Sequence, residues 1–438
     1  MKPNIQDKAT EISSYLEESD FIRCISHNDA DGLAAAGILS ESMRKLGKQF
    51  HTSIVGRPSE EIIEKINDED DCSVILFDMG SGQPELIKKI DSEVAVVDHH
   101  PPSYEDEIAN HHLNPHHYGI DGSFSASAST LSYLVCKNLP IENADLGCVS
   151  LAGAIGDMQH LPMDGLNLEI LNEMRSKNVI EIKKGLRFTD KINKSLEKST
   201  SPFLKGISGN SLTTQKILKS LDINGNETFW ELQEDKKRKL ISFIVLKLIK
   251  QGAEINRIKS TIGEVYEVNN KEFNYVSELS SLLNACGTKD EYGLALSLVL
   301  GPKQRFEEAE KIKNEHKSEL LKNINEAIEN LNEQNNLYHI EVDHRASKGT
   351  VCGILVDYVF TDKPIFTYYI DEDEISISSR GNKLLIERNL DLSEVMKKAA
   401  NEVGGNGGGH NIASGATIPK NELKNFLKKA NEMIGEQL

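Results

Sequence analysis

The sequence predicts an α/β fold, with an N-terminal parallel-sheet domain, a helical insert, a long linker helix and a smaller C-terminal α/β domain. Three observations support this prediction. Short apolar runs alternate with amphipathic segments in the N-terminal part, which favours a parallel sheet with helices on both faces. The same alternation returns after residue 336. The chain also has 438 residues, which is too long for one ordinary hydrophobic core.

In the N-terminal part, helices are expected at residues 4–18 and 33–46, where leucine and alanine recur at helical spacing. Three apolar runs, each followed by a polar loop, are expected to be strands: residues 21–25, 73–77 and 93–97. Ligands bind at the carboxyl edge of open parallel sheets, so these loops are the expected site. Residues 148–157 are small and apolar, and are expected to form a buried helix that ends in an aspartate.

Further along the chain, residues 165–250 are expected to be largely helical, and the charged stretch 303–335 is expected to be one long exposed helix. In the C-terminal part, the expected strands are residues 337–342, 365–370 and 374–378, and the expected helices are 349–360 and 391–402. The four predicted domains cover residues 1–185, 186–302, 303–335 and 336–438. We expect the active site in the cleft between the two α/β domains.

Composition excludes several classes of protein. The six cysteines are scattered without a CxxC pair, which argues against a structural zinc site and a disulfide framework. No apolar run approaches the roughly 20 residues that cross a bilayer, so no membrane contact is expected and the cytoplasm is the expected compartment. The net charge of -18 repels nucleic acid, so any nucleic-acid contact is expected in a local basic groove.

Four loops carry candidate metal ligands, each at the end of an apolar segment. They contain His27, Asp29 and Asp31; then Asp78; then Asp98, His99 and His100; and finally Asp157. A single aspartate after a strand is usually a helix cap or turn residue, but that explanation does not account for four such clusters. Oxygen and nitrogen donors together favour Mn²⁺, with Mg²⁺ or Co²⁺ as alternatives. Two such cations could clamp the attacking and leaving oxygens of a phosphodiester.

Two other segments suggest ligand contacts. Five glycines between residues 404 and 409 expose backbone N–H groups, and His410 adds a donor beside them, which suits holding a phosphate. Arg380, at the end of an expected strand, is a candidate partner for the same phosphate. The histidine-rich segment 110–117 is interpreted as a solvated loop near the site, with a second metal-linked loop as the alternative.

These motifs resemble those of the DHH phosphoesterase superfamily. The resemblance rests on Ser26–Gly32, Asp78, Asp98–His100 and Gly156–Asp157, and the glycine-rich element resembles the substrate-binding motif of the DHH-associated C-terminal domain. In the middle of the chain, Thr200–Gly209 and Ser281–Gly287 resemble archaeal RecJ-like nucleases. The resemblance covers essentially the whole chain.

The resemblance implies a role for each residue. His27 and Asp29 would hold one cation, and Asp31, His99 and Asp157 would hold the other, with Asp78 bridging the two. Asp98 would orient His99, and His100 would contact the scissile phosphate or assist the leaving group. A phosphate of the nucleic-acid end would be held by Arg380, His410 and the backbone amides of Gly407, Gly408 and Gly409. Thr288 stands where these relatives are expected to have arginine, so no substrate contact is assigned there.

The resulting prediction is a metal-dependent exonuclease that releases mononucleotides from single-stranded DNA or RNA, in DNA replication and repair or in RNA turnover. One alternative is a phosphatase for very short oligonucleotides or nucleoside bisphosphates, although such a substrate needs no helical insert. Another is a replisome component that docks on GINS and other replisome proteins. Both strand ends carry similar phosphates, so the sequence favours neither polarity, nor does it favour DNA over RNA.

Overall fold

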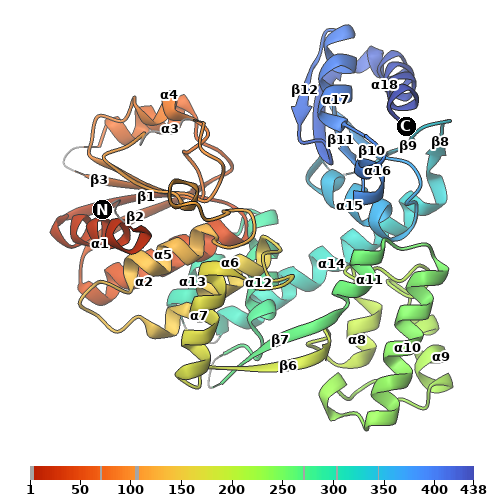
Figure 1. The fold of residues 1–438 in the computed structure, drawn as a ribbon, viewed down its shortest axis with the longest axis horizontal. Coiled ribbons are helices and arrows are strands. Elements are labelled where there is room, and N and C mark those ends of the chain that lie inside the picture. The colour runs from red at the N-terminus through yellow and green to blue at the C-terminus, as the bar shows by residue number, and fades with distance from the viewer. Residues whose placement is uncertain (1–3, 70–71, 104–107, 270–271, 302–303, 344) are drawn as a thin grey trace. The chain divides into compact units, whose positions relative to one another are not determined.

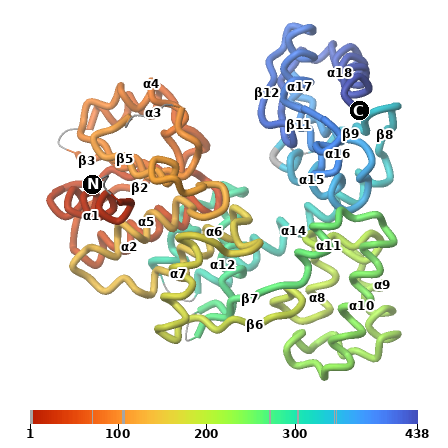
Figure 2. Tube along the Cα trace, in the orientation of Figure 1, coloured from red at the N-terminus to blue at the C-terminus, as the bar shows by residue number. Residues whose placement is uncertain are grey.

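The computed structural model describes residues 4–69, 72–103, 108–269, 272–301, 304–343 and 345–438. The chain forms two compact units, each built from separate stretches of sequence (Figure 1). Unit 1 contains residues 1–183 and 264–314, and unit 2 contains residues 184–263 and 315–438. The chain therefore passes from one unit to the other three times, along the path traced in Figure 2.

Unit 1 contains a five-stranded sheet in which all strand pairs are parallel, in the order β2-β1-β3-β4-β5. The strands are β1 Phe21–His27, β2 Gln49–Val55, β3 Ser73–Phe77, β4 Val94–Val97 and β5 His111–Leu113. The strand order changes direction between β1 and β3, because β2 adds on one side of β1 and the later strands add on the other. Such a switch point opens a crevice at the carboxyl ends of the strands.

Helices cover both faces of this sheet. Alternate residues of β3 point to opposite sides: Ile75 and Phe77 join the core beneath the larger helices, whereas Val74 and Leu76 join the core beneath α3 and α4 (Figure 1). The helices of unit 1 are α1 Ile5–Glu18, α2 Ala30–Leu46, α3 Glu60–Asn67, α4 Pro84–Ile87, α5 Ala128–Cys136, α6 Gly147–Gly156, α7 Gly165–Ser176, α12 Val276–Thr288 and α13 Tyr292–Leu300. Because α12 packs on α2 and α6, residues of the stretch 264–314 join the same hydrophobic core as the N-terminal helices.

Unit 2 contains a six-stranded mixed sheet in the order β12-β13-β11-β10-β9-β8. Its strands are β8 Asn332–Glu333, β9 Tyr338–Glu341, β10 Ile365–Ile370, β11 Glu374–Arg380, β12 Asn406–Gly409 and β13 Ala413–Pro419. Its helices are α8 Ile192–Glu197, α9 Ser211–Ser220, α10 Glu234–Lys250, α11 Ile255–Ser260, α15 Lys348–Tyr358, α16 Lys383–Glu387, α17 Leu392–Glu402 and α18 Leu423–Gln437.

Three further elements each belong partly to unit 1 and partly to unit 2, because the boundary between the units falls within them. The strands β6 Ile180–Leu186 and β7 Ile262–Val268 pair with each other, and the long helix α14 runs from Gln304 to Asn330. Short 3₁₀ helices are η1 Pro115–Tyr118, η2 Ala144–Leu146, η3 Phe229–Glu231, η4 Arg345–Ser347 and η5 Lys420–Glu422. No helix in the described part of the chain is long and apolar enough to cross a membrane.

The α/β class, with a parallel N-terminal sheet and a smaller C-terminal sheet, is confirmed. The compact units nevertheless group the residues differently from the four predicted domains, because residues 264–301 belong with the N-terminal sheet and not with a separate helical region. Residues 302 and 303, where the predicted middle region meets the predicted linker, lie outside the described residues. The four-part division by function stays a prediction.

Of three further local expectations, two were wrong and one was confirmed. The stretch 303–335 is not an exposed helix throughout, because Phe306, Leu320 and Ile324 are buried along α14 at helical spacing. Residues 165–250 are largely helical, as expected, although they include the strand β6, whose lysines lowered its apolar signal. The histidine-rich segment is only partly a solvated loop, because it contains the short strand β5.

Candidate metal centre

The loop after β1 is shaped by a helix cap. Asp29 is the N-cap of α2, and its Oδ1 accepts hydrogen bonds from the backbone N–H groups of Asp31 at 3.1 Å and Gly32 at 3.0 Å. A Cβ atom at Gly32 would lie 2.4 Å from the carbonyl oxygen of His27, so only glycine fits there. The cap uses one carboxylate oxygen of Asp29, and the other lies 2.8 Å from Nδ1 of His27. Asp29 thus caps the helix with one carboxylate oxygen and presents the other oxygen beside His27.

Asp78 lies between the two histidines that the sequence singled out. Its Oδ1 is 3.2 Å from Nε2 of His99, and its Oδ2 is 3.3 Å from Nδ1 of His27. The side chain is buried, and the backbone φ of 59° lies in the left-handed region that aspartate adopts only at some cost. Such strain persists where surrounding contacts require it, and here it turns the carboxylate toward both imidazoles.

The second histidine meets two further carboxylates. Nε2 of His99 lies 3.2 Å from Oδ2 of Asp157 and 3.9 Å from Oδ2 of Asp31. Asp31 is fully buried, and its carboxylate accepts hydrogen bonds from the backbone N–H groups of Ala128 and Ser129 at the start of α5. Asp157 follows the last residue of α6, as the sequence predicted for the buried helix.

The donor atoms fit divalent cations. Four buried atoms lack a hydrogen-bond partner even though other polar atoms lie close to them: Nδ1 of His27, Nε2 of His99 and both carboxylate oxygens of Asp78. These atoms converge without hydrogen-bond geometry, as ligand atoms around a cation do. Within each of three groups, one donor atom per residue lies within 4.8 Å of the others: His27, Asp29 and Asp78; Asp31, His99 and Asp157; and Asp78, His99 and His100.

The electrostatics of the cluster point the same way. Burial and the nearby Asp78 raise the pKa of Asp31 to about 6, and burial and Asp31 raise the pKa of Asp157 to about 6. Burial opposes the charged form of His27, but Asp29 and Asp78 outweigh it and raise its pKa to about 10. The pKa of His99 is also raised well above its ordinary value, because Asp157 and Asp78 outweigh its burial. Crowded carboxylates that repel one another are what a divalent cation would neutralise.

The expectation that Asp98 orients His99 was wrong. Oδ1 of Asp98 instead accepts hydrogen bonds from the backbone N–H of His100 at 3.1 Å and from its Nδ1 at 2.8 Å. Nδ1 of His99 is held by the carbonyl oxygen of Gly122 at 2.7 Å. Asp98 and His100 are two residues apart in the segment that continues β4, so their side chains share one side of the chain, and that of His99 points to the other.

Sequence reasoning missed a buried network behind Asp98. The backbone N–H of Ser81 donates to Oδ2 of Asp98 at 2.9 Å, and Nδ2 of Asn114 donates both to Oγ of Ser81 and to the carbonyl oxygen of His100, each at 2.9 Å. Oγ of Ser81 also lies 3.0 Å from Nε2 of His112, whose pKa burial lowers to about 4. His112 is therefore neutral, and its tautomer decides whether Nε2 or the serine hydroxyl donates the hydrogen bond. The network joins the ends of β3, β4 and β5, and the Asn114–Pro115 pair after β5 was its one signal in the sequence.

The predicted phosphate-binding residues all belong to unit 2. Gly407, Gly408 and Gly409 lie in β12, the edge strand of the sheet, and not in a loop. The neighbouring strands are in register, with Gly409 opposite Ser414 and Arg380 opposite Ala413. The backbone N–H of His410 donates to the carbonyl oxygen of Ala413 at 2.9 Å, so Arg380 and His410 lie at the same end of the sheet.

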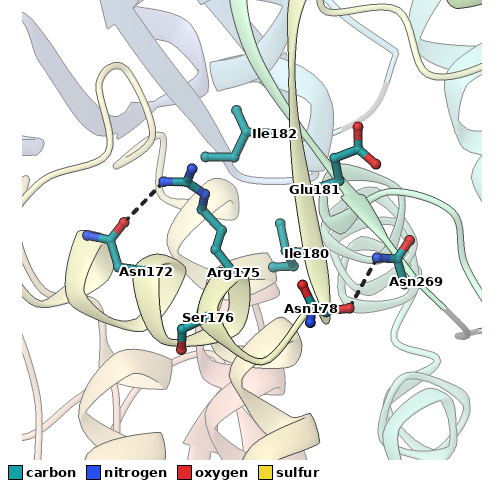
Figure 3. Close-up of a pocket in the computed structure, with 8 residues that line it drawn as sticks. All are labelled: Asn172, Arg175, Ser176, Asn178, Ile180, Glu181, Ile182 and Asn269. Carbon is teal, nitrogen blue, oxygen red and sulfur yellow. Dashed lines mark hydrogen bonds between the residues drawn. The ribbon is translucent and has the colours of Figure 1, made fainter.

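A surface hollow elsewhere in unit 1 is not part of this centre. The hollow, of about 570 Å³, lies beside α7 and β6 and is drawn in Figure 3. Its lining combines Arg175 with three asparagines, and Asn172 accepts a hydrogen bond from Arg175. The residues that line it include no histidine and none of the predicted ligands.

Comparisons with known proteins cover both units. Residues 22–153 match the N-terminal domain of the DHH family, and residues 336–436 match the DHHA1 domain. An uncharacterized protein of Methanocaldococcus jannaschii is 34% identical over 432 residues, which is 97% of this chain and 95% of that protein.

Solved structures share the fold at low identity. The RecJ of Thermus thermophilus in complex with Mn²⁺ aligns with a TM-score of 0.62 and 14% identity over 99% of this chain, which spans 55% of the RecJ chain. CDC45 from Entamoeba histolytica aligns with a TM-score of 0.67 and 10% identity over 99% of both chains. Identities this low show the fold alone.

Proposed function

We propose, because this chain belongs to the DHH family and carries a DHHA1 domain, that it is a metal-dependent exonuclease for single-stranded DNA or RNA. It would hydrolyse phosphodiester bonds and release mononucleotides. The observation that carries this proposal is the convergence of two imidazoles and four carboxylates at the carboxyl edge of the sheet in unit 1. The DHH-family phosphoesterase fold of the chain supports hydrolysis as the reaction class.

The cluster suits two divalent cations, for which Mn²⁺ is the leading candidate and Mg²⁺ or Co²⁺ are alternatives. His27 and Asp29 would hold one cation, Asp31, His99 and Asp157 would hold the other, and Asp78 would bridge them. When bound, such a pair supplies Lewis-acid stabilisation of the charge on a reacting phosphate. The position of Asp78, with one oxygen near each histidine, supports the bridging role.

His100 and Asp98 would act on the substrate rather than on the cations. The imidazole of His100 is half exposed, and Asp98 holds its Nδ1 at 2.8 Å, which fixes the ring and leaves Nε2 for an oxygen of the substrate. Asp98 itself is fixed by His100 and Ser81. This arrangement of a carboxylate behind an imidazole is typical of a group that donates a hydrogen bond or a proton.

In unit 2, Arg380, His410 and the amides of Gly407, Gly408 and Gly409 would hold a phosphate of the nucleic-acid end. In the described part of the chain Arg380 has no ion pair, and its NH1 donates to the carbonyl oxygen of Ser379. A guanidinium with no acidic partner among the described residues, at the end of β11 and at the same end of the sheet as His410, suits an anion.

The experiment is a time course on a 30-nucleotide single strand, as DNA and as RNA, with the label at each end in turn and a dinucleotide for comparison. The proposal predicts mononucleotide release from the long strand, and the end from which the label is lost first gives the polarity. Strong preference for the dinucleotide would instead support a small-nucleotide phosphatase. Failure to hydrolyse either substrate with Mn²⁺ present would contradict the proposed chemistry.

Docking on GINS and other replisome proteins stays a prediction. A pull-down with purified GINS tests it directly, with Asp78→Ala protein in parallel to separate docking from hydrolysis. Retention of GINS by both proteins would support a replisome component, and retention by neither would leave a free-standing nuclease.

A further inference from the structure

Two large apolar side chains are exposed next to residues of the candidate metal centre, one on the loop that contacts His99 and one directly after Asp157. Phe124 has 65% of its surface exposed and Met158 has 46%. Phe124 lies two residues after Gly122, whose carbonyl oxygen holds Nδ1 of His99, and Met158 directly follows Asp157. Single exposed apolar residues are common on protein surfaces, so their placement decides whether these two have a role.

The loop that carries Phe124 and the turn that carries Met158 are held together by hydrogen bonds to one carbonyl oxygen. The carbonyl oxygen of Gly122 accepts a hydrogen bond from Nδ1 of His99 at 2.7 Å and another from Nε2 of the buried Gln159 at 2.9 Å. A Cβ atom at Gly122 would lie 2.0 Å from the carbonyl oxygen of His99, so the loop packs directly on that histidine. Phe124 therefore follows the anchored carbonyl by two residues in one loop, and Met158 directly precedes the anchored Gln159 in the other.

The loop that carries Phe124 is fixed on its far side as well. The backbone N–H of Ser125 donates to the carbonyl oxygen of Asp121 at 2.9 Å, and the carbonyl oxygen of Ser125 accepts from the N–H of Asn167 at 3.3 Å. A Cβ atom at Gly165 would lie 2.5 Å from Cβ of Ser125, which shows close packing against the start of α7. Phe124 is thus exposed on a loop that is held in place on both sides.

Met158 is exposed at the cost of backbone strain. Its φ of 61° lies in the left-handed region, which a side chain as large as methionine rarely adopts. The strain is maintained by Gln159, whose backbone N–H donates to Ala154 at 2.9 Å and whose Oε1 accepts from Nδ2 of Asn167 at 2.7 Å. The turn that buries Gln159 points Met158 outward, next to Asp157.

We propose that Phe124 and Met158 form an apolar platform for the nucleobase of the nucleotide whose phosphodiester reaches the metal centre. The proposal rests on the proposed function and names how the same site engages its substrate. Every base has an apolar face, and neither side chain carries a hydrogen-bonding group that could distinguish one base from another. The platform would therefore accept any sequence. Its contact does not depend on charge, which matters in a chain of net charge -18 that attracts phosphates weakly.

The first test is kinetic and uses the Mn²⁺-loaded enzyme. Phe124→Ala combined with Met158→Ala is expected to raise KM for a 30-nucleotide single strand by about 10-fold, since stacking of one base on an aromatic side chain commonly contributes about 5- to 150-fold to affinity. The value of kcat should stay within about 2-fold, since neither residue touches the predicted ligands' donor atoms. Phe124→Tyr with Met158→Leu should restore KM, and Leu212→Ala, an equally exposed apolar residue on α9, should leave KM unchanged.

An abasic substrate separates base contact from a merely structural effect. Wild-type enzyme should bind a strand with abasic terminal nucleotides about 10-fold more weakly than the intact strand, and the double alanine variant should no longer distinguish the two. An unchanged KM for the double variant would overturn the platform. So would a variant that still prefers intact DNA by the wild-type factor, and that result would leave the exonuclease itself in place.

A binding measurement gives a readout that needs no turnover. Phe124→Trp adds an indole to a chain whose single native tryptophan gives the background in the wild type. With a phosphorothioate oligothymidylate and the Mn²⁺-loaded protein, the added emission should be quenched as the oligonucleotide binds. Binding detected by anisotropy without any change in that emission would refute the platform. If wild-type protein binds no oligonucleotide and hydrolyses none, the proposed function fails instead.

Discussion

The sheets of the two units each end in a cluster of polar residues, but the two clusters are built in opposite ways. In unit 1, carboxylates and imidazoles crowd together in a largely buried space around the strained Asp78. In unit 2, His410 is exposed directly after an edge strand of glycines, and Arg380 ends β11, two strands away at the same end of the sheet. The first cluster suits cations and the second suits an anion.

The difference shows how strongly a structure can indicate an absent ligand. Burial makes the first cluster informative, because polar atoms removed from water without a hydrogen-bond partner are costly unless a ligand satisfies them. The second cluster is open to solvent, so water can satisfy Arg380 and His410, and their role depends more on sequence resemblance. Substitutions in the buried cluster are therefore expected to have the largest effects.

The largest effect is expected from Asp78→Ala, which should lower kcat by on the order of 1,000-fold, at the upper end of what removing one electrostatic group costs. The reason is that a bridging carboxylate touches both predicted cations. Nuclease assays and circular dichroism measure activity and fold, and the fold should be retained. Asp68→Ala, at an exposed aspartate of the same unit, is the matched control and should behave as the wild type. Near wild-type turnover of Asp78→Ala would refute the two-cation assignment.

The second cluster should matter less for the chemical step. Arg380→Ala is expected to raise KM for single-stranded DNA by about 30-fold, because a charge-assisted hydrogen bond to phosphate contributes about 2 kcal/mol. Steady-state kinetics would measure this, with exposed Arg388→Ala as the control. If kcat fell as far as in Asp78→Ala while KM stayed constant, the contrast between the two clusters would be lost.

The hydrogen-bond network behind Asp98 should affect both catalysis and the stability of the fold. Asn114→Ala removes the donor to Ser81 and to the carbonyl oxygen of His100, and should lower kcat by about 10-fold, the smaller end of the range for residues that orient a site. It should also destabilise the chain by about 1–3 kcal/mol, because a buried carbonyl loses its donor. Urea denaturation measures the second effect, and Asn138→Ala, on the surface after α5, is the comparison. An effect on stability alone would exclude a positioning role.

The smallest effect is a pH dependence of the metal-free protein. The pKa of His27 is raised to about 10, so the stability it contributes is complete below its unfolded pKa of roughly 6.5 and is lost as pH rises through 10. Asp31 and Asp157, with pKa values of about 6, lose their contribution earlier, as pH rises from about 4 to 6. The melting temperature of chelated protein should therefore fall between pH 6.5 and 10.

Added Mn²⁺ must displace these protons, so the affinity of the chain for Mn²⁺ should increase over the same pH range. A melting temperature that rises with pH would contradict this electrostatic account.

Much of the fold was predictable because burial leaves a clear pattern. The strand β3 was predicted at its observed bounds, since a strand covered on both faces is a continuous apolar run. The strand β2 at the sheet edge and the three-residue β5 were missed, because neither has such a run. The glycines of β12 were not recognised as a strand, since glycine has little intrinsic preference for one.

The candidate site shows the same limit at the level of single residues. Parallel strands bring their carboxyl ends together, so the convergence of Asp78, His99 and Asp157 could be expected from sequence. The partner of Asp98 could not, because it depends on which side of the chain each residue faces after β4 ends. The hydrogen bonds between Gly122 and His99 and between Asn114 and His100 could not be predicted either, because tertiary packing alone sets the conformation of their loops.

The most direct test of the two-cation centre is the electron paramagnetic resonance of Mn²⁺ bound to the purified chain, with bound metal counted by elemental analysis. The account predicts two Mn²⁺ per chain with the spectrum of a coupled pair, and loss of the coupling in Asp78→Ala. A single uncoupled Mn²⁺ at saturation, or full nuclease activity in a chelator with no metal bound, would contradict it.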